Sequence, residues 1–418
     1  MNDQNPESPA GPDTPRGCPV AHRSTEPVRL YGPEAATDPH GIYERLRKEH
    51  GSVAPVLLEG DIAAWLVLGY RDSRRVLDNP RQFARDGRIW RDWREGRVAE
   101  TSPLVPMLAW RPDCVSQDGE AHRRLRGAVS DSLQAAADRG IRRHATHFAN
   151  KQIDAFADAG RADLVADYAE LLPMLVTARI LGLAEAEGRR LVASCAQVMK
   201  GGEDAVTHDG VIREIFGELA ERRRTEPASD LATGLLEHHA GLDHDEVVAH
   251  LRAVLIAAHV TTSLLARVLE LVLTDSARLS GLISGQLTIT AVMEEAMWNH
   301  PPLAVLPGRF AAGDVELGGH SIEEGDLLVL GLAPGNHDPE VRPDPSASVQ
   351  GNQAHLAFGS GPHECPGQSI GMSIIEVAVD VLLHRLPGLR LAVPPEELGA
   401  TASTWMSLLD SLPVEFTV

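Results

Sequence analysis

The sequence has few cysteines, few lysines and no long apolar run, and each shortage excludes a class of protein. Its four cysteines, Cys18, Cys114, Cys195 and Cys365, lie far apart and form no C-x-x-C pair. Neither a disulfide framework nor a zinc site is therefore expected, and a reducing cytoplasm suits these thiols. No stretch reaches the ~18 consecutive apolar residues of a membrane span. Residues 1–25 are rich in Pro, Asp, Asn and Ser without an apolar core, which predicts a disordered tail instead of a signal peptide.

The charge of the chain is strongly acidic. Among its 418 residues, 39 are basic and 59 are acidic, and the net charge of −20 argues against nucleic acid or an anionic membrane as a partner. Only three residues, Lys48, Lys151 and Lys200, are lysines. This arginine bias indicates a GC-rich genome and is consistent with an actinobacterial source. No linker or repeat divides the chain, so residues 26–418 are expected to form one large domain.

Hydrophobic periodicity predicts a mostly α-helical fold with small β-sheets. Helical patterns dominate from Glu120 to about Arg278, with breaks expected near Gly160, at residues 201–202 and near Gly241. Further elements are expected as helices over Pro39–Glu49, Tyr70–Asn79, Asp243–Thr274 and Gln368–Leu386, as strands over Val53–Leu58, Ala63–Leu68, Val315–Leu317 and Leu327–Leu332, and as a long ordered loop over residues 80–116.

The most informative stretch is F-G-S-G-P-H-E-C-P-G, which precedes an apolar-periodic helix and builds a cradle for one thiol. Pro366 suits the first turn of the helix that follows. The helix dipole and unpaired backbone N–H groups at that end are expected to lower the pKa of Cys365 and to favour a metal-binding thiolate. The glycines allow tight turns and close approach to a flat ligand, and they are Gly359, Gly361 and Gly367.

The spacing F-G-x-G-x-H-x-C-x-G is filled at every fixed position, and it resembles the cysteine loop of the cytochrome P-450 family of haem-thiolate monooxygenases. The resemblance implies the cytochrome P-450 fold and haem b (iron protoporphyrin IX) with Cys365 as its axial iron ligand. It also implies that His363 bonds a haem propionate, that Phe358 packs near the sulfur, and that Gly359 and Gly367 contact the cofactor. The alternative is a buried structural cysteine, which six fixed positions in ten residues disfavour.

Two further segments are candidates for binding the propionates. His122 and Arg126 are four residues apart and share one helix face, and Arg309 lies in a P-G-R-F segment before a strand-turn pattern. By the resemblance all three bind propionates, since cationic donors match carboxylates. A solvated basic face and a surface arginine are the ordinary alternatives. Arg123 and Arg124 add a basic patch that suits an acidic electron donor, which the family usually needs.

The long helix contains A-A-H-V-T-T at residues 257–262, which lines up with the family's oxygen-binding groove. By the resemblance Ala258 lies against the cofactor, and the catalytic hydroxyls are those of Thr261 and Thr262, with Thr261 helping to deliver protons. The groove departs from the family, because Ala258 replaces a glycine and Val260 replaces an acid that relays protons. His259 is a weak substitute, because it points about 100° away. A hydroxyl bonded to its own helix is the alternative for Thr261.

A second departure lies in E-E-A-M-W-N-H-P-P. Most relatives carry Glu-x-x-Arg here, whereas Trp298 follows Glu295 and forms no charge pair. The later partner arginine is also in doubt, with Arg342 early and Asn352 near the expected position. Solvent, Asn352 or another donor must therefore satisfy Glu295. The chain resembles a minority group of actinobacterial members that lack this arginine.

Three functions remain open at this point. The first is a monooxygenase that takes electrons from an external ferredoxin and reductase and inserts one oxygen atom into a substrate. The second is an atypical haem enzyme that uses peroxide or performs coupling chemistry, and the third is a non-catalytic haem-binding partner protein. By the resemblance the substrate is a small, largely apolar molecule. Its expected contacts are residues 80–116, 195–204, 257–261, 303–306 and 405–408.

Overall fold

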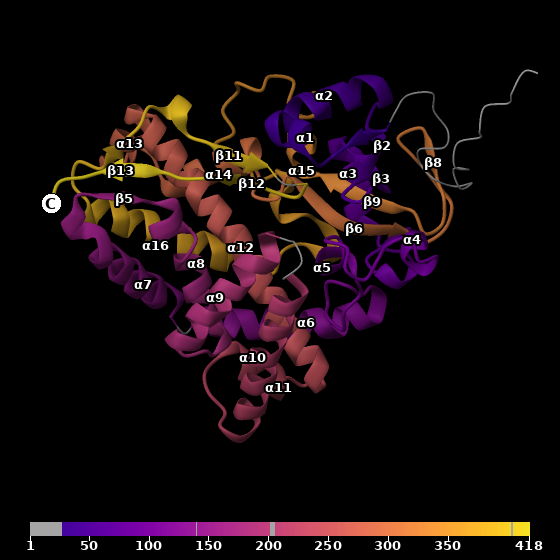
Figure 1. The fold of residues 1–418 in the computed structure, drawn as a ribbon, viewed down its shortest axis with the longest axis horizontal. Coiled ribbons are helices and arrows are strands. Elements are labelled where there is room, and N and C mark those ends of the chain that lie inside the picture. Colours follow the sequence, from indigo (N-terminus) through magenta and orange to yellow (C-terminus); the bar gives the residue numbers. More distant parts are fainter. Residues whose placement is uncertain (1–26, 139, 201–204, 403) are drawn as a thin grey trace, which may run out of the picture.

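The computed structural model describes residues 27–138, 140–200, 205–402 and 404–418, so the expected tail over residues 1–25 and the break at residues 201–202 lie outside the described residues. One part of the molecule is built on a sheet and the other on packed helices, and α12 (His244–Thr274) runs through the middle (Figure 1). The expectation of a mostly helical fold with small sheets is confirmed.

The largest sheet has the strand order β1-β2-β3-β9-β6-β4. Its hairpin matches the sequence-based expectation, because β2 and β3 pair antiparallel from Val53 opposite Val67 to Leu58 opposite Ile62. Strand β3 then pairs in parallel with β9, which brings chain segments more than 260 residues apart together. The strands are β1 (Val28–Arg29), β2 (Val53–Leu58), β3 (Ile62–Val67), β4 (Phe83–Ala84), β6 (Val305–Ala311) and β9 (Leu327–Gly331). The expected strand over Val315–Leu317 is β7, paired with β8 (His320–Ile322).

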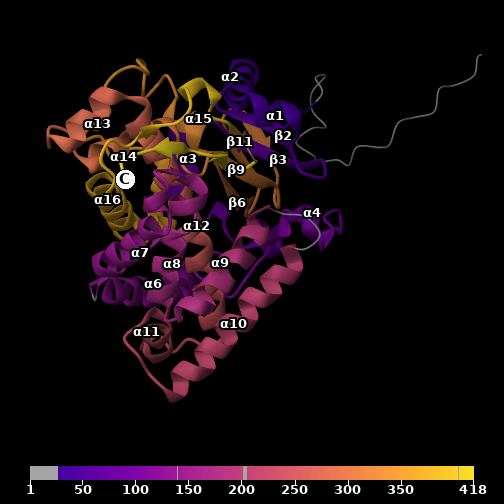
Figure 2. The same ribbon diagram turned by 60° about the vertical axis from the view of Figure 1, so that its left-hand side comes forward.

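The helical part surrounds α12. Asp243 caps its first turn in a reciprocal pair with Glu246, which satisfies two of the free N–H groups of the helix start. This helix is long and apolar enough to cross a membrane, but half of its apolar window is buried inside the fold. Helices grouped below the sheet-bearing part in Figure 2 are α6 (Gly119–Asp138), α7 (Ile141–Phe156), α8 (Leu172–Leu181), α9 (Glu185–Lys200), α10 (Ala205–Thr225) and α11 (Leu231–Glu237).

The remaining helices outside the 80–116 loop pack beside the sheets or against the helical part. They are α1 (Pro33–Thr37), α2 (Pro39–His50), α3 (Tyr70–Asp78), α13 (Ser276–Ile283), α14 (Ile289–Asn299), α15 (Leu332–Asn336) and α16 (Gln368–Arg385). The expected helices over Pro39–Glu49, Tyr70–Asn79 and Gln368–Leu386 are thus confirmed within one residue at each end. Helix α16 packs on both α7 and α12, which places the cysteine loop ahead of it close to the central helix.

Helix breaks at two glycines and several of the short strands were not expected from the sequence. Gly140 and Gly182 adopt positive φ angles of 140° and 110° and separate α6 from α7 and α8 from α9. Strand β5 (Arg161–Asp163) forms a second sheet with β13 (Pro413–Glu415) and β10 (Arg390–Leu391). A further pair joins β11 (Ala400–Ala402) to β12 (Ser407–Leu409).

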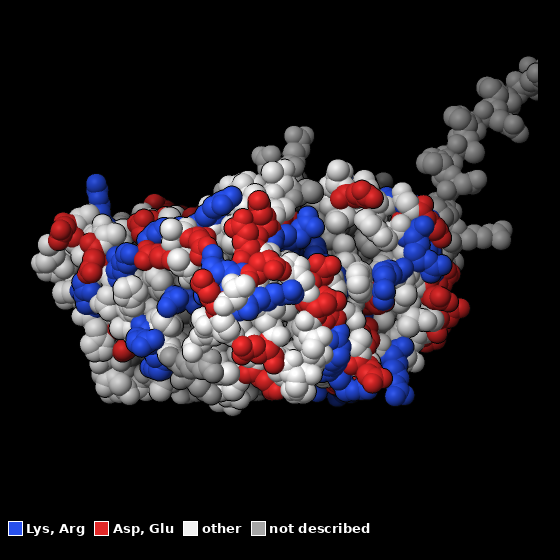
Figure 3. Space-filling model, turned by 90° about the horizontal axis from the view of Figure 1, so that it is seen from below, with Lys and Arg blue, Asp and Glu red and all other residues white. Residues whose placement is uncertain are grey.

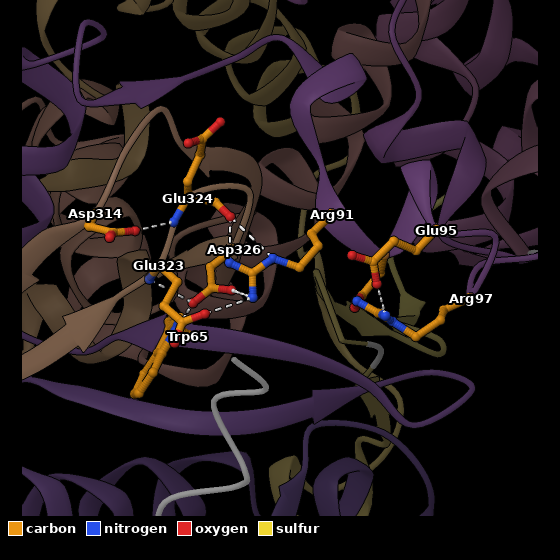
Figure 4. A network of polar contacts seen from close by, with 9 residues as sticks. Trp65, Arg91, Glu95, Arg97, Asp314, Glu323, Glu324 and Asp326 are labelled. Carbon is orange, nitrogen blue, oxygen red and sulfur yellow. Dashed lines mark hydrogen bonds and ion pairs between the residues drawn. The ribbon is translucent and has the colours of Figure 1, made fainter. Parts of the chain in front are cut away.

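The loop over residues 80–116 contains short elements and is fixed to the sheet through β4, which pairs with β6, and through Arg91. It holds α4 (Arg91–Arg94) and α5 (Val105–Leu108). The Arg91 guanidinium lies 3.0 Å from a Glu323 carboxylate oxygen and 3.4 Å from Asp326, whose other oxygen accepts a 3.0 Å hydrogen bond from Trp65 Nε1 (Figure 4). Burial raises the pKa of Asp326. The loop is therefore ordered, as expected, and tied to the turn before β9.

Candidate active site

The cysteine loop is a compact turn closed by its own backbone. The Cys365 N–H donates a 2.9 Å hydrogen bond to the Phe358 carbonyl. Gly359 and Gly361 both have φ of 69°, and a Cβ at Gly361 would lie 2.9 Å from the Asp78 carboxylate. These two glycines are therefore required by the turn and by its contact with α3. At Gly367, whose φ is −100°, an added Cβ would meet no protein atom within 4 Å.

The structure corrects two expectations about Cys365. Its pKa is raised, because burial of the thiol outweighs the hydrogen bond from the Gly367 backbone and the charge of Arg126. Pro366 lies in a turn before α16, whose N-cap is Gly367, and is not part of the first helical turn. The protein alone therefore keeps a neutral thiol, and a bound metal ion would supply the charge that favours the thiolate.

A cationic cluster lies beside this loop. His363 Nε2 contacts the Asp118 carboxylate at 2.9 Å, so in this arrangement its carboxylate partner is a protein group. Asp118 also accepts a 2.7 Å hydrogen bond from the Arg85 backbone. The rings of His122 and His363 are 4.1 Å apart, and within the described part of the chain the buried His122 Nε2 has no hydrogen-bond partner. Burial lowers the pKa of both histidines, that of His363 to about 3.

One buried and one half-buried arginine complete the cluster. Arg309 is 2% exposed, and among the described residues its only hydrogen bond is a 3.3 Å contact to the Gly308 carbonyl. Burial lowers the pKa of Arg309 well below its usual value. Arg85 is held by the carbonyls of Val115, Pro307 and Gly308 at 2.7 to 2.9 Å. Buried guanidinium groups that lack bonded carboxylates favour an anionic ligand.

The cluster fits the carboxylate groups of a haem, which carries two propionates. Beside the cysteine loop lie the buried His122 Nε2, which has no hydrogen-bond partner among the described residues, and the buried guanidinium of Arg309, which bonds only the Gly308 carbonyl. Open space lies over Gly367. His122, Arg309 and His363 are thus brought together, as the sequence suggested. Arg126 lies close enough to His122 for its charge to lower that pKa, after the larger effect of burial, and its guanidinium donates to the Glu364 carbonyl and to Ser130. It contacts the cysteine loop and lowers the Cys365 pKa by its charge, although burial prevails.

The central helix faces the cysteine loop at Thr261. A Cβ added at Gly371 on α16 would lie 3.4 Å from the Thr261 hydroxyl oxygen, so the two helices meet there. The Thr261 hydroxyl makes no hydrogen bond within the described residues, whereas Thr262 donates a 2.7 Å bond to the His259 carbonyl. The self-bonded hydroxyl expected as the alternative for Thr261 is thus found at Thr262. Ala258 is buried, and burial lowers the pKa of His259.

Trp298 makes a neutral contact, and the neighbouring Glu295 finds its ion-pair partner on another helix. Trp298 is 3% exposed, and its indole N–H donates a 2.7 Å bond to the Asn352 carbonyl. Glu295 is satisfied by Arg278, at 2.9 Å, which resolves the question of its partner. Arg342 lies 5.9 Å from the centre of the Trp298 ring and bonds Asn299, and within the described residues it makes no ion pair with Glu295.

Three contributors to the site were missed by the sequence analysis. Asp118 contacts His363 of the cysteine loop, 245 residues away, and Arg85 contacts Asp118, 33 residues away. No local pattern marks either residue. Asn336 is fully buried and bridges α14 to the loop, donating to the Met297 carbonyl and accepting from the Leu356 N–H at 2.9 and 2.8 Å. Only the Asn-His-Asp-Pro run that begins at Asn336 was a visible signal.

Comparison with known proteins identifies relatives over almost the whole chain. The family model described as cytochrome P-450 matches residues 287–409. Nocardicin C N-oxygenase of Nocardia uniformis is 32% identical over 93% of this chain and 97% of that protein. Cytochrome P-450 monooxygenase PikC of Streptomyces venezuelae is 29% identical over 92% of each protein. The solved structure of CYP154C4 from a Streptomyces species superposes with a TM-score of 0.84 at 26% identity, covering 95% of this chain and all of that one.

Proposed function

Because the chain belongs to the cytochrome P-450 family of haem-thiolate monooxygenases, we propose that it inserts one oxygen atom into a C–H or C=C bond of a small, largely apolar molecule. Electrons would come from an external ferredoxin and ferredoxin reductase. The observation that supports this most is the buried cationic cluster beside the Cys365 loop, with its orphaned His122 nitrogen. The likeness to Nocardicin C N-oxygenase and to the monooxygenase PikC supports a substrate from secondary metabolism.

Each group of residues has a role that follows from its position. When bound, haem b supplies the oxygen-activating chemistry, which an electron-rich thiolate promotes. Cys365 provides that thiolate, and Phe358, Gly359 and Gly367 shape the surface around it. His122, Arg309 and His363 hold the propionates by charge-assisted hydrogen bonds. Arg126 holds the loop itself.

Proton delivery is assigned to α12. The Thr261 hydroxyl, which makes no hydrogen bond within the described residues, is available to donate and accept protons. Thr262 orients this turn of the helix through its bond to the His259 carbonyl. Ala258, which lies one turn before Thr262 and is buried, leaves room for the flat cofactor. Val260 contributes no proton, so the chain depends on Thr261 and on water.

The basic patch for the electron donor is smaller than the sequence suggests. Arg124 pairs with Glu246, so its charge is already matched. Arg123 remains exposed on the same helix. Acidic and basic side chains are interspersed on the face seen from below, without a dominant sign (Figure 3). We therefore propose a transient donor interface and a soluble cytoplasmic protein formed as one domain over residues 26–418.

The experiment that tests the haem-thiolate assignment is an absorbance spectrum, ferric and then reduced under carbon monoxide. The wild-type protein should show the red-shifted thiolate Soret band, and Cys365→Ala should lose it. Cys195→Ala, which truncates another buried cysteine, is the matched control and should keep the band. Retention of the thiolate signature in Cys365→Ala would refute the assignment.

The second candidate is an atypical haem-thiolate protein that uses peroxide or has lost oxygen activation. Val260 in the groove and Trp298 in place of the arginine favour it. Turnover supported by hydrogen peroxide but not by a ferredoxin and reductase would select the peroxide route. Haem binding without turnover by either route would select the non-catalytic one.

A further inference from the structure

Two adjoining cavities lie among helices α6 to α11, in the helical part below the sheet-bearing part (Figure 2). The larger has a volume of about 340 Å³ and the smaller a volume of about 170 Å³. Both are lined by His144 on α7 and Arg179 on α8, so the two cavities share a wall. None of the residues assigned above to the haem, the oxygen groove or the substrate lines either cavity.

Arginines from three helices line the larger cavity. They are Arg143 on α7, Arg179 on α8 and Arg223 on α10. Asp230 is the one acid among the described side chains that line it. Its Oδ2 accepts a 2.6 Å bond from Arg223 Nε, and its Oδ1 accepts the Thr233 N–H at 2.9 Å. Asp230 is thus matched by Arg223, and Arg143 and Arg179 make no ion pair among the described residues.

The packing of α8 fixes the position of Arg179. Nine of the ten residues of this helix are buried, and Arg179 is its one exposed residue. The helix ends at Gly182, where an added Cβ would lie 2.5 Å from Asp230 Oδ2, and the Gly182 carbonyl accepts a 2.8 Å bond from Arg223. The end of α8 therefore abuts the matched Asp230–Arg223 pair, and Arg179 extends from a rigid helix into the cavity.

Arg143 lies where the helix dipole favours the opposite charge. Arg142 and Arg143 fall in the first turn of α7, which holds no acid and has no side-chain cap. Arg142 is matched by Glu376 at 3.2 Å, whereas Arg143 is not matched by any described acid. Burial lowers the pKa of His144, and the charges of Arg143 and Arg179 lower it further, which agrees with their shared place in the cavity wall.

This arrangement suits a doubly charged anion. Arg143 and Arg179 are both exposed, so water screens their charges in the unliganded protein and their donors are free to bond a ligand. A phosphate monoester carries about −1.5 to −2 charges near pH 7, whereas a carboxylate carries one. Guanidinium groups match phosphate oxygens through parallel hydrogen bonds. The larger cavity is also within the range of ~300 to 1,000 Å³ that ligand sites occupy.

The smaller cavity adds apolar contacts beside the cationic one. Its acid, Glu185, is already bonded to Lys151 at 2.6 Å and to Arg189 at 3.0 Å. A cavity of ~150 Å³ is large enough for a benzene ring, so one small ring fits here. The apolar side chains that line it are Phe148, Leu175, Ala178 and Leu183.

We propose that these cavities form a binding site for a phosphate monoester with one small apolar group. The phosphate lies between Arg143 and Arg179, and the apolar group lies in the smaller cavity. This site is separate from the groove assigned to the substrate, and it does not depend on the proposed function.

Isothermal titration of the purified full-length protein at pH 7.5 tests the site with phenyl phosphate, inorganic phosphate and benzoate. Phenyl phosphate should bind about ten-fold more tightly than either of the others, because only it has both the dianion and the ring. Arg143→Gln and Arg179→Gln should each weaken its binding about ten-fold. Arg75→Gln, which removes an exposed arginine on α3, is the matched control and should bind like the wild type.

A second measurement locates the ligand. The imidazole signal of His144, assigned by its loss in His144→Gln, is followed by NMR as the pH is changed. A dianion bound beside this ring favours its protonated form, so phenyl phosphate should raise the pKa of His144. The same addition to Arg179→Gln should raise it less.

Four results would overturn the proposal. An affinity for phenyl phosphate no greater than that for benzoate would reject the dianion, and equal affinities for phenyl phosphate and inorganic phosphate would reject the ester. Binding that survives both arginine substitutions, or that falls equally in Arg75→Gln, would place the ligand elsewhere. An unchanged pKa of His144 in the presence of bound phenyl phosphate would do the same.

Discussion

The indole Nε1 of Trp298 and the carbonyl oxygen of Asn352 are joined by a 2.7 Å hydrogen bond that ties α14 to the segment leading into the cysteine loop. The rings of Trp298 and His355 lie edge to face with their centroids 6.1 Å apart, and the centroids of His355 and Phe358 are 5.6 Å apart. Phe358 in turn accepts the Cys365 N–H. A continuous set of contacts therefore runs from the neutral Trp298 side chain to the cysteine.

Replacing Trp298 should distinguish a lost hydrogen bond from a buried charge. Trp298→Phe removes one neutral bond, and we expect a loss of about 1 kcal/mol in the free energy of unfolding. Trp298→Arg should cost more, about 3 to 5 kcal/mol, because Arg278 already occupies Glu295 and the new cation would be buried unpaired. Urea unfolding measures both, with Trp93→Phe as control. A Trp298→Arg protein as stable as the wild type would contradict this account.

Much of the fold follows from local sequence. Asp243 and Glu246 mark the start of α12 as a capping pair, and the Gly60 turn marks the first hairpin. The breaks at Gly140 and Gly182 were missed because a glycine inside an apolar pattern does not by itself end a helix. Strand β5 was missed because its partner β13 lies about 250 residues away, beyond the reach of periodicity.

The site is predictable to the extent that it is local. The Cys365 loop and the helix face of His122 are visible as spacings, but the contacts of Arg85 with Asp118 and of Arg278 with Glu295 are made by folding. The direction of the Cys365 pKa shift was wrong for the same reason. Burial is a property of the whole fold, and it outweighed the local backbone contribution.

Arg309 should affect haem retention and protein stability in opposite directions. Its guanidinium is buried and bonds no carboxylate in the described chain, so Arg309→Gln removes an unfavourable buried charge. We expect the haem-free protein to be as stable as the wild type or more stable. Haem transfer to apomyoglobin should be about ten-fold faster, since a charge-assisted bond contributes ~1.5 to 3 kcal/mol. Arg278→Gln, which breaks an ion pair elsewhere, should lower stability. Unchanged haem transfer in Arg309→Gln would contradict the propionate assignment.

Val260 should limit the efficiency of oxygen use. A valine neither donates nor relays protons, and an acid at this position of α12 would supply that step. With a substrate identified by screening, Val260→Asp should raise the fraction of consumed electrons that appear in product, whereas the isosteric control Val260→Thr should raise it less. The measurement is product formed per reducing equivalent. No change in Val260→Asp would indicate that Thr261 and water already provide a sufficient relay.

His250 should make the stability of the loop depend on pH. Its Nε2 accepts the Cys114 N–H, so the ring must stay neutral to keep this bond, and burial lowers its pKa from 6.5. The folded protein therefore binds this proton less readily than the unfolded chain, whose histidines titrate near 6.5. Its contribution is fully present above about pH 6.5 and is lost as the pH falls below that value.

The test compares urea midpoints of the wild type and His250→Gln between pH 8 and pH 5. The wild type should lose stability more steeply below pH 6.5, by up to about 1.4 kcal/mol per pH unit for this one group. His384→Gln, which removes an exposed histidine on α16, should follow the wild-type curve. Parallel curves for wild type and His250→Gln would contradict a neutral His250.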